Sequence, residues 1–412
     1  MTEKIAKPHL RFAGFDDTWE QRKVGELLIE RNEQAPMNEE YPLMAFIANE
    51  GVAPKGERYD RSSLVTDTEN KLYKRTEFGD FIYSSNNLET GSIGLNKYGK
   101  ACISPVYSVF HPTGIADSNF LGRRLVRKDF INSMVKWRQG VIYGQWRIHE
   151  SDFLKIDIPV PSVEEQRQIG TFLDYLDNLI TLHQRKYDKL TNVKKSMLEK
   201  MFPKNGSNVP EIRFKGFSDA WEQRKLGDIV ERVVRKNTNN ESSLPLTISA
   251  QYGLVDQITY FNNRVASRDV SNYYLVLNGE FAYNKSTSDG FPFGAVKRLD
   301  LYEKGVLSTL YIVFSIKNQS EIDSDYLTVF FDTDRWHKGV SERAAEGARN
   351  HGLLNISADD FFDIDIFLPR HKEEQVAIGS YLRHLDNLIT LHQRELEKLK
   401  NLKKACLEKM FV

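Results

Sequence analysis

The chain has 412 residues, of which 40% are apolar, so it can bury more than one core, and its 57 basic and 57 acidic residues leave no formal net charge. Zero net charge excludes a globally basic surface for nucleic acid, although local basic grooves remain compatible with it. The sequence shows no signal-peptide pattern and no apolar stretch long enough to cross a bilayer, and Cys102 and Cys406 offer neither zinc spacing nor a disulfide framework, so we expect a cytoplasmic protein that contacts no membrane.

The first predicted element is a short head at 8–27, PHLRFAGFDDTWEQRKVGEL, which recurs at 210–229 as PEIRFKGFSDAWEQRKLGDI. Trp19 and Trp221 occupy the same place in the two copies and keep the same apolar neighbours. We therefore interpret both tryptophans as core anchors rather than as stacking platforms for bases.

A variable body follows each head, and its landmarks recur in the same order. GDFIYSS at 79–85 answers GEFAYNK at 279–285, and SDFLKIDIPVP at 151–161 answers DDFFDIDIFLP at 359–369. The offset between copies is 202 residues at the heads and 209 near the end of each copy, so loops differ in length while the order is kept. This pattern indicates a tandem duplication of a whole domain.

Short apolar runs inside the second body predict buried strands at 273–277 and 306–314. The segment 359–367, DDFFDIDIF, alternates apolar and acidic residues. We interpret it as a strand with outward-facing aspartates rather than as a metal site, because no His or Glu cluster accompanies it.

Each copy ends in a long predicted helix. Residues 164–202 align without gaps to 373–411, and the nonamer DNLITLHQR is identical at 177–185 and 386–394. Apolar residues follow steps of four and three over more than four heptads, which is typical of a coiled-coil seam. Ser162 and Glu165 have the spacing of a capping box, whereas the second helix begins less distinctly near Arg370 and His371, and PKNGSNVP at 203–210 is a linker.

Both helices start acidic and end basic, so antiparallel pairing sets each acidic start beside a basic end. Antiparallel pairing would also bring His183 and His392 together at the centre. We favour the interpretation that these two polar residues fix the register of the seam, and the alternative is that they form a pH switch.

These patterns predict a mixed α/β fold in which two tandem bodies are separated by two long helices that form an antiparallel coiled coil related by a pseudo-two-fold axis. We expect the first domain, with its head and body, at 1–158, the first helix and linker at 159–205, the second such domain at 206–368 and the second helix at 369–412.

Catalytic signatures are missing from the sequence. It contains no G-x-x-x-x-G-K-[ST], no G-x-G-x-x-G, no Asn-Pro-Pro or Asp-Pro-Pro, and its nine histidines have no metal spacing. We therefore expect a non-catalytic chain without a metal or cofactor of its own.

The WEQRK-x-G head, the variable body and the EEQ-x-x-IG…LDNLI segment, all present twice, resemble the specificity subunit of Type I restriction-modification enzymes over essentially the whole chain. The resemblance implies that each body is a target recognition domain for one half of a split, asymmetric sequence in double-stranded DNA. It also implies that the helices dock two methyltransferase subunits and, through them, restriction/translocase subunits. AdoMet, ATP and Mg²⁺ are then expected in those partners, which methylate adenine or cleave DNA.

Polar loops that interleave Arg, Lys, Asn or Gln with aromatics or glycines are candidates for reading base edges. We align NKYGK at 96–100 and 137–147 in the first body with 283–294 and 341–352 in the second. The basic run RRLVRK at 123–128 is interpreted as a solvated basic face or phosphate contact. The candidate DNA-binding residues are Lys97, Tyr98, Lys100, Arg138, Gln139, Tyr143, Gln145, Arg147, Asn284, Lys285, Ser286, Thr287, Arg343, Arg349, Asn350 and His351.

The identical nonamer includes residues outside the apolar seam, which a structural role in the seam does not explain. We interpret these residues as contacts to the methyltransferase copies, with neutral recent duplication as the alternative. They are Asn178, Thr181, Gln184, Arg185, Asn387, Thr390, Gln393 and Arg394. Two other classes of protein stay open at this point: a coiled-coil adaptor with two ligand-binding bodies, and an enzyme with an unfamiliar site.

Overall fold

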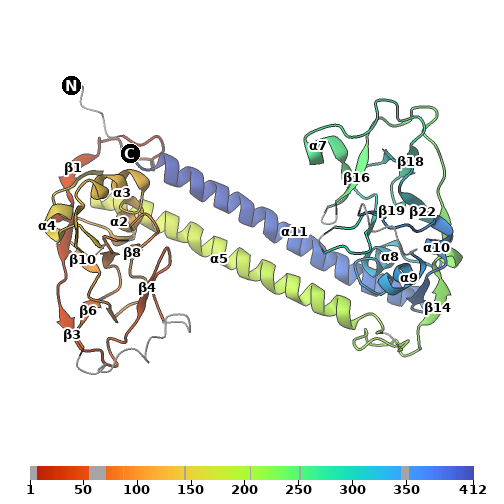
Figure 1. Ribbon diagram of the computed structural model, residues 1–412, viewed down its shortest axis with the longest axis horizontal. Helices are drawn as coiled ribbons and strands as arrows, with labels where there is room; N and C mark the ends of the chain where they lie inside the picture. Colours follow the sequence, from red (N-terminus) through yellow and green to blue (C-terminus); the bar gives the residue numbers. More distant parts are fainter. Residues whose placement is uncertain are drawn as a thin grey trace. The chain divides into compact units, whose positions relative to one another are not determined.

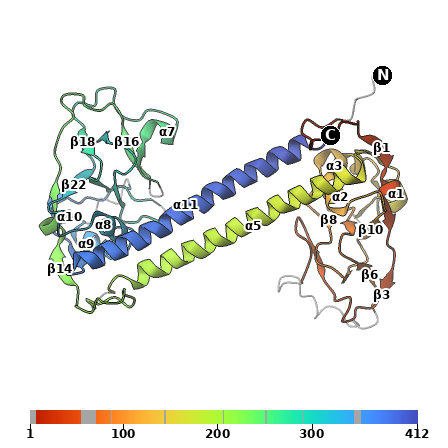
Figure 2. The ribbon, with the colours of Figure 1, turned by 180° about the vertical axis from the view of Figure 1, so that it is seen from behind.

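The structure is a computed structural model that describes residues 7–54, 71–86, 88–142, 145–204, 206–249, 252–288, 290–344 and 352–412, without side-chain detail at 140–142, 145 and 146. The chain forms two compact units. Residues 1–183 and 395–412 make up the first, and residues 184–394 make up the second. Each unit therefore contains one head, one body and parts of both long helices (Figures 1 and 2).

The first unit is built around a four-stranded antiparallel sheet in the order β2-β10-β7-β8, with further small sheets β1-β13, β3-β6-β9, β4-β5 and β11-β12. Its elements are β1 (Glu20–Lys23), α1 (Val24–Leu27), β2 (Leu28–Glu30), β3 (Gln34–Ala35), β4 (Ala45–Ile47), β5 (Gly51–Ala53), β6 (Tyr73–Thr76), β7 (Phe81–Tyr83), β8 (Ile93–Leu95), β9 (Ala101–Ile103), β10 (Ser108–Pro112), α2 (Ser118–Arg124), α3 (Lys128–Val135), β11 (Gln139–Ile142), β12 (Gln145–Arg147), α4 (Glu150–Phe153), β13 (Asp157–Val160) and the start of α5 (Val163–Lys200).

The second unit repeats this plan with the sheet β15-β22-β19-β20 and the pairs β14-β23, β16-β17 and β18-β21. Its elements are β14 (Glu222–Lys225), α6 (Leu226–Ile229), β15 (Val230–Arg232), β16 (Leu246–Ser249), β17 (Gly253–Asp256), α7 (Gln257–Phe261), β18 (Tyr274–Leu277), β19 (Phe281–Asn284), β20 (Ala295–Arg298), β21 (Lys304–Leu307), β22 (Ile312–Ile316), α8 (Ser324–Phe330), α9 (His337–Arg343), α10 (Ala358–Phe362), β23 (Asp365–Leu368) and the start of α11 (Lys372–Lys409). The predicted mixed α/β fold is confirmed.

The two long helices run antiparallel where they pack together in each unit. In the first unit the start of α5 shares a core with the end of α11, through Leu173 and Met410 among others. In the second unit Leu382 near the start of α11 shares a core with Met197 near the end of α5. The predicted antiparallel pairing is thus confirmed inside each unit. His183 and His392 are half-buried, and their meeting at the centre stays a prediction.

The end of each helix is fastened to a head by aromatic contacts. The ring of Phe411 lies 6.5 Å from that of Trp19, and the ring of Phe202 lies 6.0 Å from that of Trp221. Both tryptophans are almost fully buried, at 4% and 3% exposed. Their predicted role as core anchors is confirmed.

Three local expectations need correction. Residues 358–362 form the helix α10 rather than a strand, because Ser357 and Asp360 make a capping box there, and only 365–368 is extended. The run 306–314 is divided between two strands by a turn. The Ser162 hydroxyl accepts from the Glu165 N–H at 3.4 Å, but the carboxylate of Glu165 is engaged elsewhere.

That carboxylate binds the head. Both of its oxygens accept from the Arg11 guanidinium, at 2.8 and 2.7 Å, and Arg213 holds Glu374 in the second unit with the same two distances. Glu165 and Glu374 are each 1% exposed, so these bidentate ion pairs are shielded from solvent. Each pair joins a head to the first turn of the long helix that follows its body.

Candidate nucleic-acid interface

Two predicted DNA-contact segments of the second body meet at one place. The segment after β19 lies against the chain that leads into α10: the Thr287 N–H donates to the Gly352 carbonyl at 2.6 Å, and the Leu354 N–H donates to the Lys285 carbonyl at 2.9 Å. Gly294 closes this loop with φ +76°, and a Cβ there would lie 2.1 Å from the Asn284 carbonyl oxygen. The backbone therefore holds the two segments side by side.

The first body has an equivalent meeting point of two loops. One of the two, the connection between β7 and β8, was not predicted to contact DNA. The Ile148 N–H donates to the Ser85 hydroxyl at 3.0 Å, and Arg138 binds both carboxylate oxygens of Glu89 at 2.7 and 2.6 Å. The β7–β8 connection thus contacts the segment that leads into α4, through Ser85 and Glu89 on one side and Arg138 and Ile148 on the other. We call 84–92 with 137–148, and 285–294 with 352–356, the paired loops of the two bodies.

The predicted alignment of 96–100 with 283–294 is wrong. The segment 96–100 follows β8, whereas 283–294 lies before β20. Insertions and deletions between the copies hide this difference in the sequence. The landmarks at 79–85 and 279–285 already align Tyr83 with Tyr283, and that alignment would have placed 84–92 opposite the loop after β19.

The segment 96–100 is a turn built on Asn96. Its carboxamide oxygen accepts from the N–H groups of Tyr98 (2.9 Å) and Gly99 (3.1 Å), and Gly99 has φ +131°. Lys100 forms an ion pair with Glu40. The Tyr98 side chain is 47% exposed at the tip of this turn.

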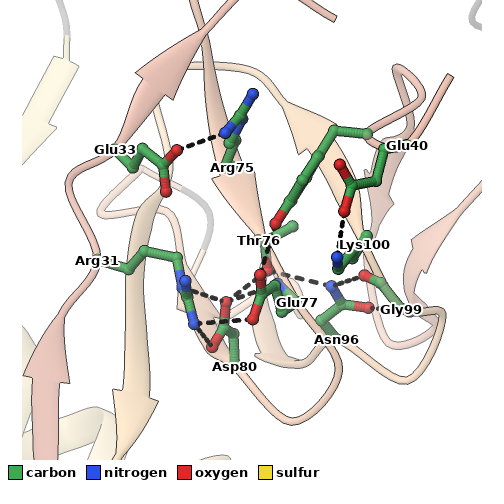
Figure 3. Close-up of polar contacts among 11 residues, drawn as sticks. Arg31, Glu33, Glu40, Arg75, Thr76, Glu77, Asp80, Asn96, Gly99 and Lys100 are labelled. Atoms are coloured by element: carbon green, nitrogen blue, oxygen red, sulfur yellow. Dashed lines mark hydrogen bonds and ion pairs between the residues drawn. The ribbon is translucent and has the colours of Figure 1, made fainter. Parts of the chain in front are cut away.

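A polar network in the first body surrounds this turn (Figure 3). The Asp80 carboxylate, nearly buried, lies 2.9 Å from Arg31 and accepts from the Glu77 N–H at 2.7 Å. Burial raises the pKa of Asp80, although these two partners oppose the shift. The hydrogen bond from the Tyr41 hydroxyl lowers the pKa of Glu77. The network ties together strands far apart in the sequence, and so holds the 96–100 turn in place.

Several predicted base readers are already engaged by acidic neighbours. The Arg138 side chain is only 12% exposed behind its bidentate contact with Glu89. Arg343 binds Asp363 at 2.7 Å. Both arginines therefore stabilise the bodies, because each guanidinium is paired with a carboxylate of its own body.

The other predicted residues differ in their surroundings. Gln139 donates to Asp152 at 3.3 Å, Lys285 donates to the Ile356 carbonyl at 3.3 Å, and Arg147 is exposed on β12. The Asn284 carboxamide accepts from the Ser286 N–H at 3.0 Å. Tyr143, Arg349, Asn350 and His351 lie outside the described residues, as does the side chain of Gln145.

The first two arginines of the basic run 123–128 do not form a solvated face, whereas Lys128 is exposed. Arg123 lies 2.5 Å from Asp174 and 3.0 Å from Asp177, both on α5. Arg124 is buried beside Asp129, where burial lowers its pKa against the opposing charge of Asp129. The run joins α2 to the long helix, and the two acidic partners of Arg123 on α5 are too distant in the sequence to be recognised there.

The repeated nonamer presents the same exposed side chains on both long helices. Its seam residues are half-buried, and the residues predicted to contact a partner protein are exposed, except for Gln184 and Gln393, which are half-buried. Leu182 and Leu391, which were not among the predicted contact residues, are 46% and 51% exposed. The exposed set on α5 is Asn178, Thr181, Leu182 and Arg185, and that on α11 is Asn387, Thr390, Leu391 and Arg394.

Within the described part of the chain, no three His, Cys, Asp or Glu side chains are grouped as metal ligands would be. None of the described helices is both long and apolar enough to span a membrane.

The fold defines a duplicated α/β protein with paired long helices, and comparison places it among known proteins. The family model for the Type I restriction modification DNA specificity domain matches residues 16–192 and 218–401. The chain therefore belongs to this family, that of the specificity subunits of Type I restriction enzymes, and the resemblance seen in the sequence is confirmed.

Individual relatives cover much of the chain. The Type I restriction enzyme MjaVIII specificity subunit of Methanocaldococcus jannaschii is 25% identical and covers 94% of this chain and 91% of its own. The putative MjaX specificity subunit of the same organism is 24% identical over 63% of this chain and 60% of its own. The solved Type I restriction-modification S subunit from M. genitalium has a TM-score of 0.58 over 98% of this chain and 99% of that one. At 13% identity this last match supports the fold alone.

Proposed function

We propose that the chain reads a bipartite DNA sequence, one half-site per body, and presents that DNA to methyltransferase and restriction subunits docked on its helices. One observation carries the proposal: the exposed residues of the repeated nonamer are identical on the two helices, whereas the paired loops of the two bodies differ in sequence. Identical surfaces suit two copies of one partner, and different loops suit two different sequences.

The paired loops are the proposed base-reading elements. Side chains that read bases must offer donors and acceptors from a rigid support. In the second body the side-chain hydroxyl and amide groups at 284–288 lie on a loop whose position is fixed by main-chain hydrogen bonds. In the first body Arg147 is exposed beside the loop that Arg138 and Glu89 brace. The candidates at 96–100 and Arg343 then act at the edge of these sites or as supports.

The helices are the proposed docking surfaces. An exposed leucine flanked by Asn, Thr and Arg, as at 178–185, is the mixed apolar and polar pattern of protein interfaces. Two methyltransferase subunits would bind, one per helix, and restriction/translocase subunits would join through them. AdoMet, ATP and Mg²⁺ would act in those partners, and the chain itself would be a non-catalytic, cytoplasmic subunit.

Reconstitution with the cognate methyltransferase subunit tests this function. The complex should methylate adenine in a target of two short defined sequences separated by unspecified bases, and the isolated chain should transfer no methyl group. A single continuous target, or methyl transfer by the pure chain, would contradict the proposal. A chain that binds the methyltransferase but adds no affinity for DNA would be an adaptor instead.

A further inference from the structure

The two bodies are fastened to their long helices by ion pairs of opposite polarity at one equivalent position. In the first unit the carboxylate of Asp174 on α5 lies 3.1 Å from the ammonium group of Lys97. In the second unit the guanidinium of Arg383 on α11 lies 2.9 Å from the carboxylate of Asp300. The helix therefore carries the anion in one unit and the cation in the other.

Backbone geometry establishes that these pairs are equivalent. Asp174 and Arg383 are 209 residues apart in the ungapped alignment of the two helices. Lys97 and Asp300 each follow a residue whose carbonyl accepts from the glycine at the turn before β7 or β19 (Gly79 N–H to Asn96, 2.8 Å; Gly279 N–H to Leu299, 2.9 Å). The same contact thus exists in both units with its charges reversed.

Neighbouring charges follow the same reversal. The first body adds Arg123, which lies 2.5 Å from Asp174. The second body adds Asp325, which lies 3.6 Å from Arg383. Arg298 of the second body also binds Asp300 and Asp325. One guanidinium does not neutralise two carboxylates, so the surface of the second body that contacts α11 has an excess negative charge, which Arg383 of α11 balances.

We propose that this reversal is a positional code that specifies which body seats on which helix. An exposed ion pair by itself contributes little, so the code acts mainly by repulsion in the wrong arrangement. The second body placed on α5 would set Asp300 and Asp325 against Asp174. The first body placed on α11 would set its cations against Arg383. Exchange of bodies between the two positions therefore requires exchange of the helix residue as well.

A full-length hybrid chain tests the code. Residues 28–158 are replaced by 230–366, so that the second body occupies both positions, and thermal unfolding is measured with and without Asp174→Arg. The substitution should raise the melting temperature of the hybrid and lower that of the wild-type chain, each by about 2 °C or more. The charge-reversed control Lys189→Glu, at an exposed position on α5, should act alike in both chains. The same sign for Asp174→Arg in both chains would overturn the code.

If neither hybrid folds, a double-mutant cycle in the wild-type chain tests whether Arg383 and Asp300 interact as the proposal requires. Arg383→Asp and Asp300→Lys should each lower the melting temperature, and the double variant should melt above the temperature expected from adding the two effects. Lys400→Asp, an exposed charge reversal on α11, combined with Asp300→Lys should show no such recovery. Strictly additive effects for the Arg383 and Asp300 pair would overturn the proposal.

Discussion

The ammonium group of Lys194 on α5 lies 2.7 Å from a carboxylate oxygen of Asp386 on α11. The equivalent residues with the helices exchanged, Asp177 on α5 and Lys403 on α11, form the same ion pair in the other unit. Each helix thus carries both halves of the contact. This reciprocity favours the antiparallel direction, because each helix supplies the acid near its start and the base near its end.

Acid should weaken the second unit through Asp332, which lies 3.1 Å from Lys194 and 2.8 Å from Lys297. Burial would raise the pKa of Asp332, but the two ammonium groups outweigh it and hold that pKa below its usual value. Because the folded-state pKa is lowered, the stabilisation is complete above the unfolded-state pKa of about 3.9. It is lost as the pH falls through the lower folded-state value.

We therefore expect Asp332→Asn to lower the free energy of unfolding by about 2 kcal/mol at neutral pH. This deficit should stay constant down to about pH 4 and close below it, as Asp332 of the wild-type chain becomes protonated. Denaturant unfolding of the wild-type chain and the Asp332→Asn variant, from neutral pH to below about pH 4, measures this difference in the free energy of unfolding. A deficit that widens as the pH falls would contradict the assigned direction of the pKa shift.

Substitution on the exposed face of α5 should remove one partner without unfolding the chain. Leu182→Asp with Arg185→Glu reverses the character of that face, so native mass spectrometry of the reconstituted complex should find one methyltransferase subunit where the wild-type chain binds two. Lys186→Glu is the matched control, because Lys186 is exposed and the second helix already has Glu395 at that place. Two bound subunits in the Leu182 and Arg185 variant would place the docking surface elsewhere.

Arg147→Ala should weaken DNA binding at the first half-site alone. An arginine that reads a guanine edge contributes about 1–3 kcal/mol of discrimination, so affinity for the cognate target should fall roughly 10-fold or more. Competition binding with targets altered in one half-site at a time measures this. If both half-sites lose discrimination equally, Arg147 contacts phosphate rather than a base.

Glu89→Gln should behave differently, although it lies at the same paired loops. It removes the charge that holds Arg138, so we expect a lower melting temperature of the chain together with weaker binding at the first half-site. Circular dichroism during heating, with the same competition assay, separates the two effects. Weaker binding at an unchanged melting temperature would show that Arg138 acts on DNA directly.

Much of the fold was accessible from the sequence, because the signals concerned were local or repeated. The seam periodicity predicted α5 and α11, and the acidic starts and basic ends predicted their direction. At 358–362 local chemistry decided against the predicted strand: the Ser357 cap supplies hydrogen bonds to the first turn of a helix that the alternating pattern did not indicate.

The candidate site was less accessible, because its contacts join residues far apart in the chain. Arg138 was a plausible base reader until the structure placed Glu89 against it, and the basic run at 123–128 was a plausible phosphate contact until Asp174 and Asp177 on α5 occupied its first arginine. Charge alone does not tell whether an arginine has an acidic partner.

Replacement of residues 28–158 by the corresponding body of a relative with another target tests the central claim most directly. Methylation mapping of DNA exposed to the reconstituted hybrid complex gives both half-sites in one measurement. We predict that the first half-site changes to that of the donor while the second half-site stays as in the wild-type complex. A hybrid that keeps both original half-sites, or changes both, would contradict the account that each body reads its own half of the target.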